Sequence, residues 1–514
     1  MADQPTTTGA ATAPVFQPVQ RVPVQTLQLR PPYKGKVTKQ ALNDQQPGTV
    51  YDSRDFVPFD GRTGRSRLSV RPGYSAFGSL ANVAGFALLG SAYSETGGVQ
   101  LFAMTASAVS KWTGSAWSNV GSITTSASRT IHAAGIGTTL YIACNNPYKK
   151  VAYNGGSPTI ATYAADTAGT IPSDCRLICA WNSRIVLAAD PSNPHVINFS
   201  RVDDPFDWDF TQEDNGTALS DSVDEAITCI FLHTHDCLVV GTKSGMWVYT
   251  GNPSQSGTKR KFAFSGGPVN STAWCKTADD YTYFISHNGL YKMAPGCGSP
   301  PEEVSRNLIP GDLIGIDGTN TTAVLVYDER FRGIQIHCQG TNAQSWFYDV
   351  DGGGFWKITA PGTSVLAAYR FGLADSVTAS GALVATSSNV MRLDSATALG
   401  GASAAYATIL MGLSPLGQKM LIQNGTVLFG ENTDDTSATV DLCAAQSPVD
   451  AVALTSDRKD SITIVKLQGN HNNWCMPRVG GQAIALKITQ GDTSKYISLE
   501  GAAFQARSSG RERG

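Results

Sequence analysis

The chain has 514 residues, of which 41% are hydrophobic and 16% charged, with 52 glycines and a formal net charge of −2. An average chain has about 25% charged residues and about 7% glycine, so this composition favours a β-rich fold with many tight turns over long charged helices. The nearly balanced charge also argues against a protein that grips nucleic acid through a strongly basic face.

The charge is distributed unevenly. Residues 1–75 contain ten Lys and Arg against five Asp and Glu, a net +5, whereas the remainder contains 29 against 36, a net −7. Phosphate contacts supply most of the non-specific affinity for DNA, so a duplex could pass the acidic body without being held tightly.

Residues 1–47 are expected to form an extended N-terminal arm. The first 33 residues contain six prolines with many Thr, Gln and Ala, and such a segment cannot bury enough apolar surface to fold alone. The start lacks the basic and apolar regions of a secretory signal, and no apolar run predicts a membrane span. We therefore expect assembly in a cytoplasm and an arm that lies along a neighbouring subunit or stays a free tail.

The segment 48–75 precedes a series of repeats and is predicted to form strands with a tight turn at Asp60 and Gly61. Four arginines on this segment are too many for one turn unless they meet carboxylates or phosphate. We interpret them as subunit-interface residues that pair with carboxylates on a neighbour, and a solvated surface turn is the alternative. These candidates are Arg62, Arg65, Arg67 and Arg71.

From Val99 to Asp394 seven copies of one hairpin unit follow one another, and the second strand of each carries a bulky residue. Successive bulky residues are 41 to 56 positions apart. The markers are Trp112, Tyr153, Phe199, Trp247, Tyr291, Phe347 and Met391. A period of roughly 40–50 residues is typical of a propeller blade. We predict an all-β fold with a β-propeller of six to eight blades over residues 48–400. A β-sandwich is the alternative, but it would show turns about every 8–12 residues without the longer period.

The pattern changes after residue 400. Strand-like segments such as KMLIQNGTVLFG and GQAIALKIT alternate over the remaining length. Residues 401–514 are therefore expected to form an additional C-terminal antiparallel β domain, part of which could close the propeller.

Two groups of residues could hold a metal ion. His233 and His235 place two imidazoles on one side of a strand, but no pattern supplies the further ligands that zinc needs, so a loop at a blade edge is favoured. The acidic run 203–209 could bind calcium through oxygen ligands but lacks the spacing of a calcium loop. We favour a turn in which Trp208 packs and the acids cap it. No metal or cofactor is predicted.

Segment 349–356, DVDGGGFW, resembles the Asp-box turn of sialidase-type propellers, with Asp349 in place of Ser. In those proteins the turn is an element of the fold and does not catalyse. The sequence has no P-loop, GxSxG, HExxH or helix-opening GxGxxG motif. We predict no catalytic residue and expect a non-enzymatic protein. The ten cysteines contain no CxxC pair, so free buried thiols are expected.

Three stretches, in this order, resemble the tail nozzle (tail tubular) proteins of short-tailed bacteriophages. They are SRDFVPFDGRTGRSRLSVRPGYS, VINFSRVDDPFDWDF followed by ITCIFLHTHDCLVVGTKSGMWVYTGNP, and the ending from NNWCMPRVGG to the C-terminus. The resemblance covers most of residues 48–514, but positions 143–150 and 296–301 match no family pattern.

The resemblance implies a virion structural protein in the tail: a β-propeller subunit of a homo-oligomeric, hexameric ring below the portal and the adaptor. Such a ring would form the lower tail channel, retain packaged DNA, guide genome ejection and carry tail fibres or spikes. Genomic DNA would pass through while being held weakly. Two alternatives stay open: a glycan-binding or sialidase-like propeller acting in host attachment, and a cellular propeller scaffold for protein partners.

Overall fold

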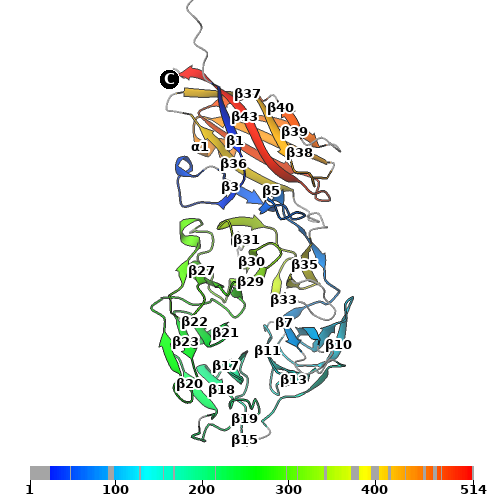
Figure 1. The fold of residues 1–514 in the computed structure, drawn as a ribbon, viewed down its shortest axis with the longest axis vertical. Helices are drawn as coiled ribbons and strands as arrows, with labels where there is room; N and C mark the ends of the chain where they lie inside the picture. Colours follow the sequence, from blue (N-terminus) through cyan, green and yellow to red (C-terminus); the bar gives the residue numbers. More distant parts are fainter. Residues whose placement is uncertain are drawn as a thin grey trace, which may run out of the picture.

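The computed structural model describes residues 24–46, 48–90, 98–126, 129–153, 156–165, 168–214, 216–296, 298–309, 311–340, 344–371, 381–394, 404–414, 418–434, 436–454, 459–466, 472–475, 477 and 479–511. These residues form two bodies: a ring of small sheets, and a pair of larger sheets that lies against one side of the ring (Figure 1). No helix within these ranges is long and apolar enough to cross a membrane.

The ring is a β-propeller of seven four-stranded antiparallel blades. The first two blades are β7 (Val83–Gly90), β8 (Val99–Thr105), β9 (Ala108–Trp112), β10 (Trp117–Ser122), and β11 (His132–Ile136), β12 (Thr139–Ala143), β13 (Lys149–Ala152), β14 (Thr159–Thr162). The next two are β16 (Leu177–Trp181), β17 (Arg184–Asp190), β18 (Asn193–Phe199), β20 (Leu219–Ser222), and β21 (Ile227–Thr234), β22 (Cys237–Thr242), β23 (Met246–Thr250), β24 (Thr258–Lys261). The fifth and sixth are β25 (Trp274–Lys276), β26 (Thr282–Ser286), β27 (Gly289–Met293), β28 (Glu302–Glu303), and β29 (Thr322–Asp328), β30 (Gly333–Gln339), β31 (Ser345–Asp349), β32 (Gly354–Ile358).

The seventh blade joins the two ends of the ring. Its strands β33 (Val365–Phe371), β34 (Gly381–Thr386) and β35 (Val390–Asp394) come last, and its outer strand β6 (Gly73–Ala76) precedes the first blade. β6 pairs with β35 in the register Leu393 to Tyr74. The N-terminal strand β6 therefore closes the propeller. The C-terminal segment, which the sequence pattern also allowed for this closure, does not.

The seven sequence repeats correspond to the seven blades. Every bulky marker lies in the third strand of its blade or directly after it, and the hairpin that precedes it is formed by the second and third strands. The prediction of an all-β propeller with six to eight blades is confirmed.

The propeller core lies between blades. Among the described residues, seven apolar clusters each join two neighbouring blades, including the last blade to the first. A central strand must therefore be apolar on both faces. In β22, Leu238 and Val240 pack toward the third blade, whereas Cys237 and Val239 pack toward the fifth, and all four are buried.

The second body is a β-sandwich assembled from both ends of the described chain. One sheet contains β4 (Phe56–Phe59), β5 (Ser66–Val70), β43 (Ser498–Arg511), β37 (Gln418–Phe429), β40 (Asn472–Cys475), β1 (Val24–Leu29) and β41 (Gly480–Gly481). The other contains β2 (Lys34–Lys36), β3 (Thr49–Arg54), β36 (Ala405–Leu413), β42 (Ala483–Gln490), β38 (Thr436–Ala445) and β39 (Lys459–Lys466). Three short helices, η1 (Leu42–Asp44), η2 (Ser305–Asn307) and α1 (Pro448–Ala453), and a small parallel pair, β15 (Ala168–Gly169) with β19 (Asp207–Trp208), complete the assignment.

These pairings differ from the expected division at residues 1–47, 48–400 and 401–514. β1 pairs antiparallel with β43, and β3 pairs with β36, so residues 24–70 belong to the sandwich. Leu27, Leu29 and Tyr33 are buried there. Composition alone suggested an arm because β43, the strand with which β1 pairs, lies at the other end of the chain. Residues 1–23 lie outside the described ranges.

The two bodies share one core. Phe347, Trp356 and Ile358 of the sixth blade belong to the same apolar cluster as the sandwich interior. β2 and β3 lie against β32, and a Cβ on Gly35 would come within 2.4 Å of the backbone of Phe355, so glycine permits this approach. The sandwich is thus packed directly onto one blade.

Candidate functional site

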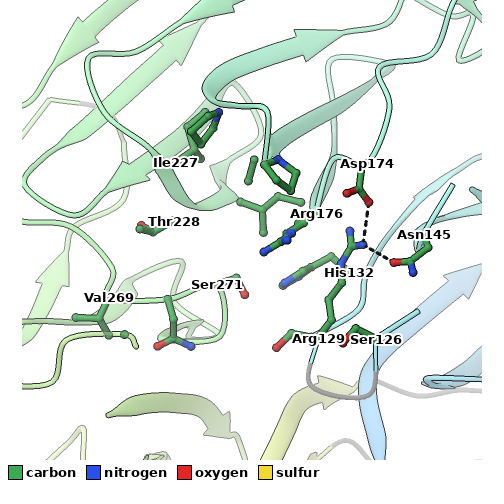
Figure 2. A pocket seen from close by; sticks show the side chains of 17 residues that line it. Ser126, Arg129, His132, Asn145, Asp174, Arg176, Ile227, Thr228, Val269 and Ser271 are labelled. Carbon is green, nitrogen blue, oxygen red and sulfur yellow. Dashed lines mark hydrogen bonds and ion pairs between the residues drawn. The ribbon is translucent and has the colours of Figure 1, made fainter. Parts of the chain in front are cut away.

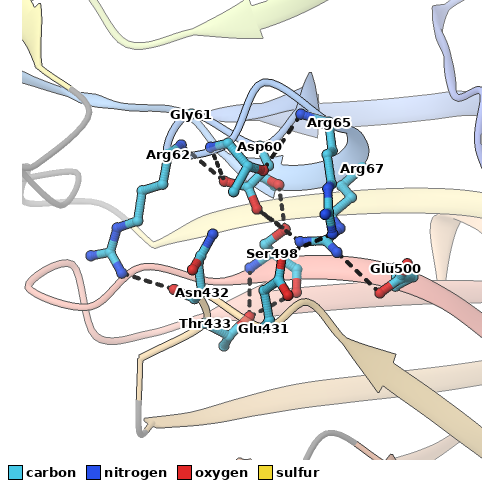
Figure 3. A network of polar contacts seen from close by, with 12 residues as sticks. Asp60, Gly61, Arg62, Arg65, Arg67, Glu431, Asn432, Thr433, Ser498 and Glu500 are labelled. Atoms are coloured by element: carbon cyan, nitrogen blue, oxygen red, sulfur yellow. Dashed lines mark hydrogen bonds and ion pairs between the residues drawn. The ribbon is translucent and has the colours of Figure 1, made fainter.

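Each of the four arginines of the segment 62–71 pairs with a carboxylate of its own chain, and Figure 3 shows Arg62, Arg65 and Arg67 around Asp60. Arg62 donates to both carboxylate oxygens of Asp434 at 2.8 and 3.3 Å, and its guanidinium lies 4.5 Å from the ring centre of Tyr496. Arg65 contacts Glu431 at 2.8 Å through side chains that are 61% and 54% exposed.

Arg67 lies in a buried polar network centred on Asp60. Its Nη1 donates to Asp60 Oδ2 at 3.1 Å, while Tyr496 and Ser498 donate their hydroxyls to the same carboxylate at 2.9 and 3.1 Å. Burial by itself raises the pKa of Asp60, but these bonds and one from the Arg62 backbone outweigh it and hold that pKa below its usual value. The network ties the β4–β5 turn to β43.

Arg71 fixes the sandwich to the propeller. Its Nε donates to Asp55 Oδ1 at 2.7 Å, and its Nη2 donates to the Thr359 carbonyl at 3.1 Å. Thr359, just after β32, donates its backbone N–H and its hydroxyl to Asp55 at 2.8 and 2.6 Å. Asp55 adopts φ of 60°, a conformation that is uncommon for a non-glycine residue and is held here by these bonds.

These pairs remove the reason for which a neighbouring subunit was expected to supply carboxylates to the arginines. The carboxylates expected on a neighbour are supplied by the chain itself, and Arg67 and Arg71 are buried within it. A contact of this segment with a neighbouring subunit stays a prediction, and Arg65 has the most exposed side chain of the four.

His233 and His235 lie in different environments and do not form a common site. His233 is buried, with Nδ1 2.7 Å from Thr282 Oγ1 and Nε2 2.8 Å from the Ala294 carbonyl, whereas His235 is exposed beside Asp236. No group of three or more His, Cys, Asp or Glu side chains suited to a metal ion occurs in the part of the chain that the structure describes.

The acidic run 203–209 forms the predicted capped turn. Asp204 accepts from the Phe206 backbone and Asp207 from that of Asp209, both at 2.9 Å, while Trp208 is fully buried. Segment 349–356 forms the hairpin between β31 and β32, with Gly353 donating to the Asp349 carbonyl and Trp356 buried. Both segments act as elements of the fold.

The cysteines depart from expectation at one position. Seven described cysteines form no disulfide bond, namely Cys144, Cys175, Cys179, Cys229, Cys275, Cys338 and Cys443. Cys237 is instead disulfide-bonded, to a cysteine whose side chain is not described. The spacing of cysteines along the chain does not reveal which of them meet in the fold, so this bond could not be predicted from the sequence.

Sequence reasoning missed a cavity of about 780 Å³ at one mouth of the propeller axis (Figure 2). Thr130, His132 and Ser271 line both this cavity and a second one, of about 580 Å³, that runs along the first strands of all seven blades. The larger cavity is lined by segments that lead into these first strands, together with the turns after β12 and β17.

Positive charge dominates the larger cavity. Arg129 donates to Asn145 Oδ1 at 3.0 Å and to the Cys175 carbonyl at 2.9 Å, and lies 3.6 Å from Asp174. Burial lowers the pKa of Arg129, because the guanidinium is only partly compensated there. Arg176 lines the same space, and Asp174 is the one carboxylate among the described lining residues.

His132 completes the polar lining. Burial, with a smaller contribution from Arg129, lowers its pKa to about 4, so the ring is neutral at physiological pH. The described lining residues include neither two facing carboxylates, as glycoside hydrolysis requires, nor a Tyr–Glu pair. Arg129 and Arg176 give this cavity the chemistry to bind an anion.

No protein-family model and no curated protein matches this chain. Among solved structures, an extracellular domain from B. thetaiotaomicron assigned to a one component system aligns at 12% identity over 65% of this chain and 42% of its own, with a TM-score of 0.39. A second such domain, of a hybrid two component system, aligns at 9% identity over 60% and 43%, with a TM-score of 0.38. The chain thus matches less than half the length of these domains.

An exo-beta-1,3-galactanase from Phanerochaete chrysosporium aligns at 9% identity over 79% of this chain and all of its own, with a TM-score of 0.29. Scores this low carry no argument about ligand or activity, and the assignment of the fold rests on the strand pairing described above.

Proposed function

We propose that this chain is a non-enzymatic structural subunit of a short-tailed phage tail, the nozzle. In this role, six copies form a ring below the portal and adaptor. The ring lines the lower tail channel, retains packaged DNA until ejection, and carries fibres or spikes.

The observation that supports this proposal most is the rigid connection between the two bodies. A sandwich built from both ends of the chain shares its core with the sixth blade, and Arg71, Asp55 and Thr359 add a buried polar link. A subunit that retains pressurised DNA has to resist relative domain movement, and a shared core with a buried link provides this resistance.

Open sheet edges provide the means of assembly. A propeller keeps its blade edges short, so ring contacts depend on added domains. In the sandwich, β40 and β39 lie at the ends of their sheets. Contacts of one such edge with a different surface of the next copy would be heterologous, and heterologous contacts can close into a ring.

Measuring the mass of the purified full chain tests the proposal. Mass photometry over a range of protein concentrations is expected to show an oligomer of six times the 54.3 kDa chain mass, because heterologous contacts close at a fixed number of copies. A particle that remains monomeric or trimeric at all concentrations, even with purified adaptor added, would contradict the ring.

The second candidate function is glycan binding in host attachment. The basic cavity at the propeller mouth favours it, because its volume lies within the range of about 300–1,000 Å³ typical of small-molecule sites. Binding of labelled full-length protein to a panel of immobilised glycans tests it. Retention by a defined set of glycans supports it, and uniform absence of retention would remove it.

A further inference from the structure

The cavity at the propeller mouth has an unbalanced charge. Its described lining contains two arginines against one carboxylate, and His132 contributes no charge at physiological pH. A cationic, partly enclosed cavity concentrates anions, because low-dielectric walls strengthen the field of each charge. An anionic group is therefore the expected occupant.

Arg129 is fixed before any ligand arrives. Its two terminal nitrogens are held by Asn145 and by the Cys175 carbonyl, and its side chain is only 10% exposed. Ordering an arginine costs side-chain entropy, and here the fold has already restricted the rotamer. The residue supplies a fixed positive charge on one wall.

The side chain of Arg176, in contrast to that of Arg129, is not held by the fold. The residue lines the cavity and is exposed; its backbone N–H donates to the Ala188 carbonyl at 3.0 Å, while its side chain makes no hydrogen bond or ion pair to any described residue. Its guanidinium can present two parallel N–H groups, a geometry that fits a carboxylate bidentately. Asp174, which could have neutralised it, is directed toward Arg129 instead (Figure 2).

The rest of the lining suits a sugar ring better than a bare anion. Leu177, Pro191, Pro194 and Ile227 give the lining apolar surface, and Ser271 and Asn145 add a hydroxyl and an amide group. A saccharide has apolar C–H faces and hydroxyl edges, so one ring can use both kinds of wall.

We propose that this cavity binds the carboxylate of an acidic sugar, with Arg176 as the residue that pairs with it and Arg129 as the fixed charge behind it. The inference rests on the second candidate function and makes it specific. It is independent of the tail-subunit proposal, whose test measures assembly alone.

Isothermal titration calorimetry on the full chain at low salt tests the assignment, with glucuronate, N-acetylneuraminate, glucose and inorganic phosphate as separate probes. We expect at least one acidic sugar to bind about tenfold or more tightly than glucose and than phosphate, since the carboxylate adds charge-assisted hydrogen bonds and the ring adds apolar contact. Arg176→Ala is expected to remove most of that preference, and Arg176→Lys to retain part of it because the charge stays while the fork is lost.

Arg306→Ala is the matched control, because Arg306 is also an exposed arginine but does not line the cavity. Its affinity is expected to equal that of the unaltered chain. Equal affinity for glucose and glucuronate, binding of phosphate without binding of an acidic sugar, or an unchanged preference in Arg176→Ala would each overturn the assignment. Retention on the glycan panel that Arg176→Ala leaves unchanged would overturn this site while leaving the second candidate function in place.

Discussion

Arg71 and Asp55 form a buried ion pair, 2.7 Å between Nε and Oδ1, at the point where the sandwich meets the propeller. Both residues belong to the N-terminal part of the sandwich, yet both also bond to Thr359 of the propeller. The pair therefore links the sandwich to the propeller through Thr359.

Replacing Arg71 with Ala is expected to lower the free energy of unfolding by about 3–5 kcal/mol, because the buried Asp55 carboxylate is left without its cation. Arg65→Ala is the matched control, since its pair with Glu431 is exposed and worth about 0–1 kcal/mol. Urea denaturation followed by tryptophan fluorescence measures both. Equal losses in the two variants would contradict the role given to Arg71, and Arg71→Lys provides a milder variant if Arg71→Ala does not fold.

The first described strand is expected to be part of the fold rather than an appendage. Leu27→Ala and Leu29→Ala should each cost about 2–5 kcal/mol, because both side chains are buried in the sandwich core. Val24→Ala on the same strand is the control, since Val24 is 55% exposed and a surface change is usually worth within about 0.5 kcal/mol. Thermal unfolding that is the same for all three variants would show that β1 does not hold the sandwich.

Acid should weaken the sandwich through Asp60. The pKa of Asp60 is lower in the folded chain than its usual value of 3.8. Its stabilising contribution is therefore complete above that value and is lost as the pH falls through the folded pKa. Urea midpoints between about pH 2 and about pH 6 should fall toward acid, and Asp60→Asn should reduce that slope.

Glu431→Gln is the control for the acid series, because its pair with Arg65 is exposed and contributes little to stability. If the urea midpoint of Asp60→Asn falls toward acid as much as that of the unaltered chain, other carboxylates must cause this pH dependence.

Duplex DNA should bind weakly at physiological salt. The chain beyond residue 75 is net acidic, and Lys259 and Lys261 on the exposed strand β24 are paired with Asp221 and Asp224. Few cations are thus available to displace counterions from phosphate. Fluorescence anisotropy with a labelled duplex measures this, and tight binding that resists added salt would contradict a conduit through which DNA slides.

The repeats predicted the propeller because every blade has to repeat the same packing. Trp112 and Phe347, far apart in the chain, occupy equivalent third strands for that reason. The closing strand at Tyr74 and the core position of Leu27 could not be predicted, because each depends on a partner more than 300 residues away.

The cavity was missed for a different reason. Arg129 and Arg176 lie in loops that carry no periodic pattern, and only the arrangement of blades brings them together. Arg67 and Arg71 were prominent in the sequence because they lie close together. In the fold they pair with the buried carboxylates of Asp60 and Asp55.

Electron cryomicroscopy of particles purified from a phage that encodes this chain tests the proposed function most directly. The tail-subunit account predicts six copies below the portal and adaptor, each fitting the propeller and the sandwich as one rigid body around a channel wide enough for duplex DNA. Particles that lack the chain, or that carry it only at a distal attachment organelle in another copy number, would contradict it.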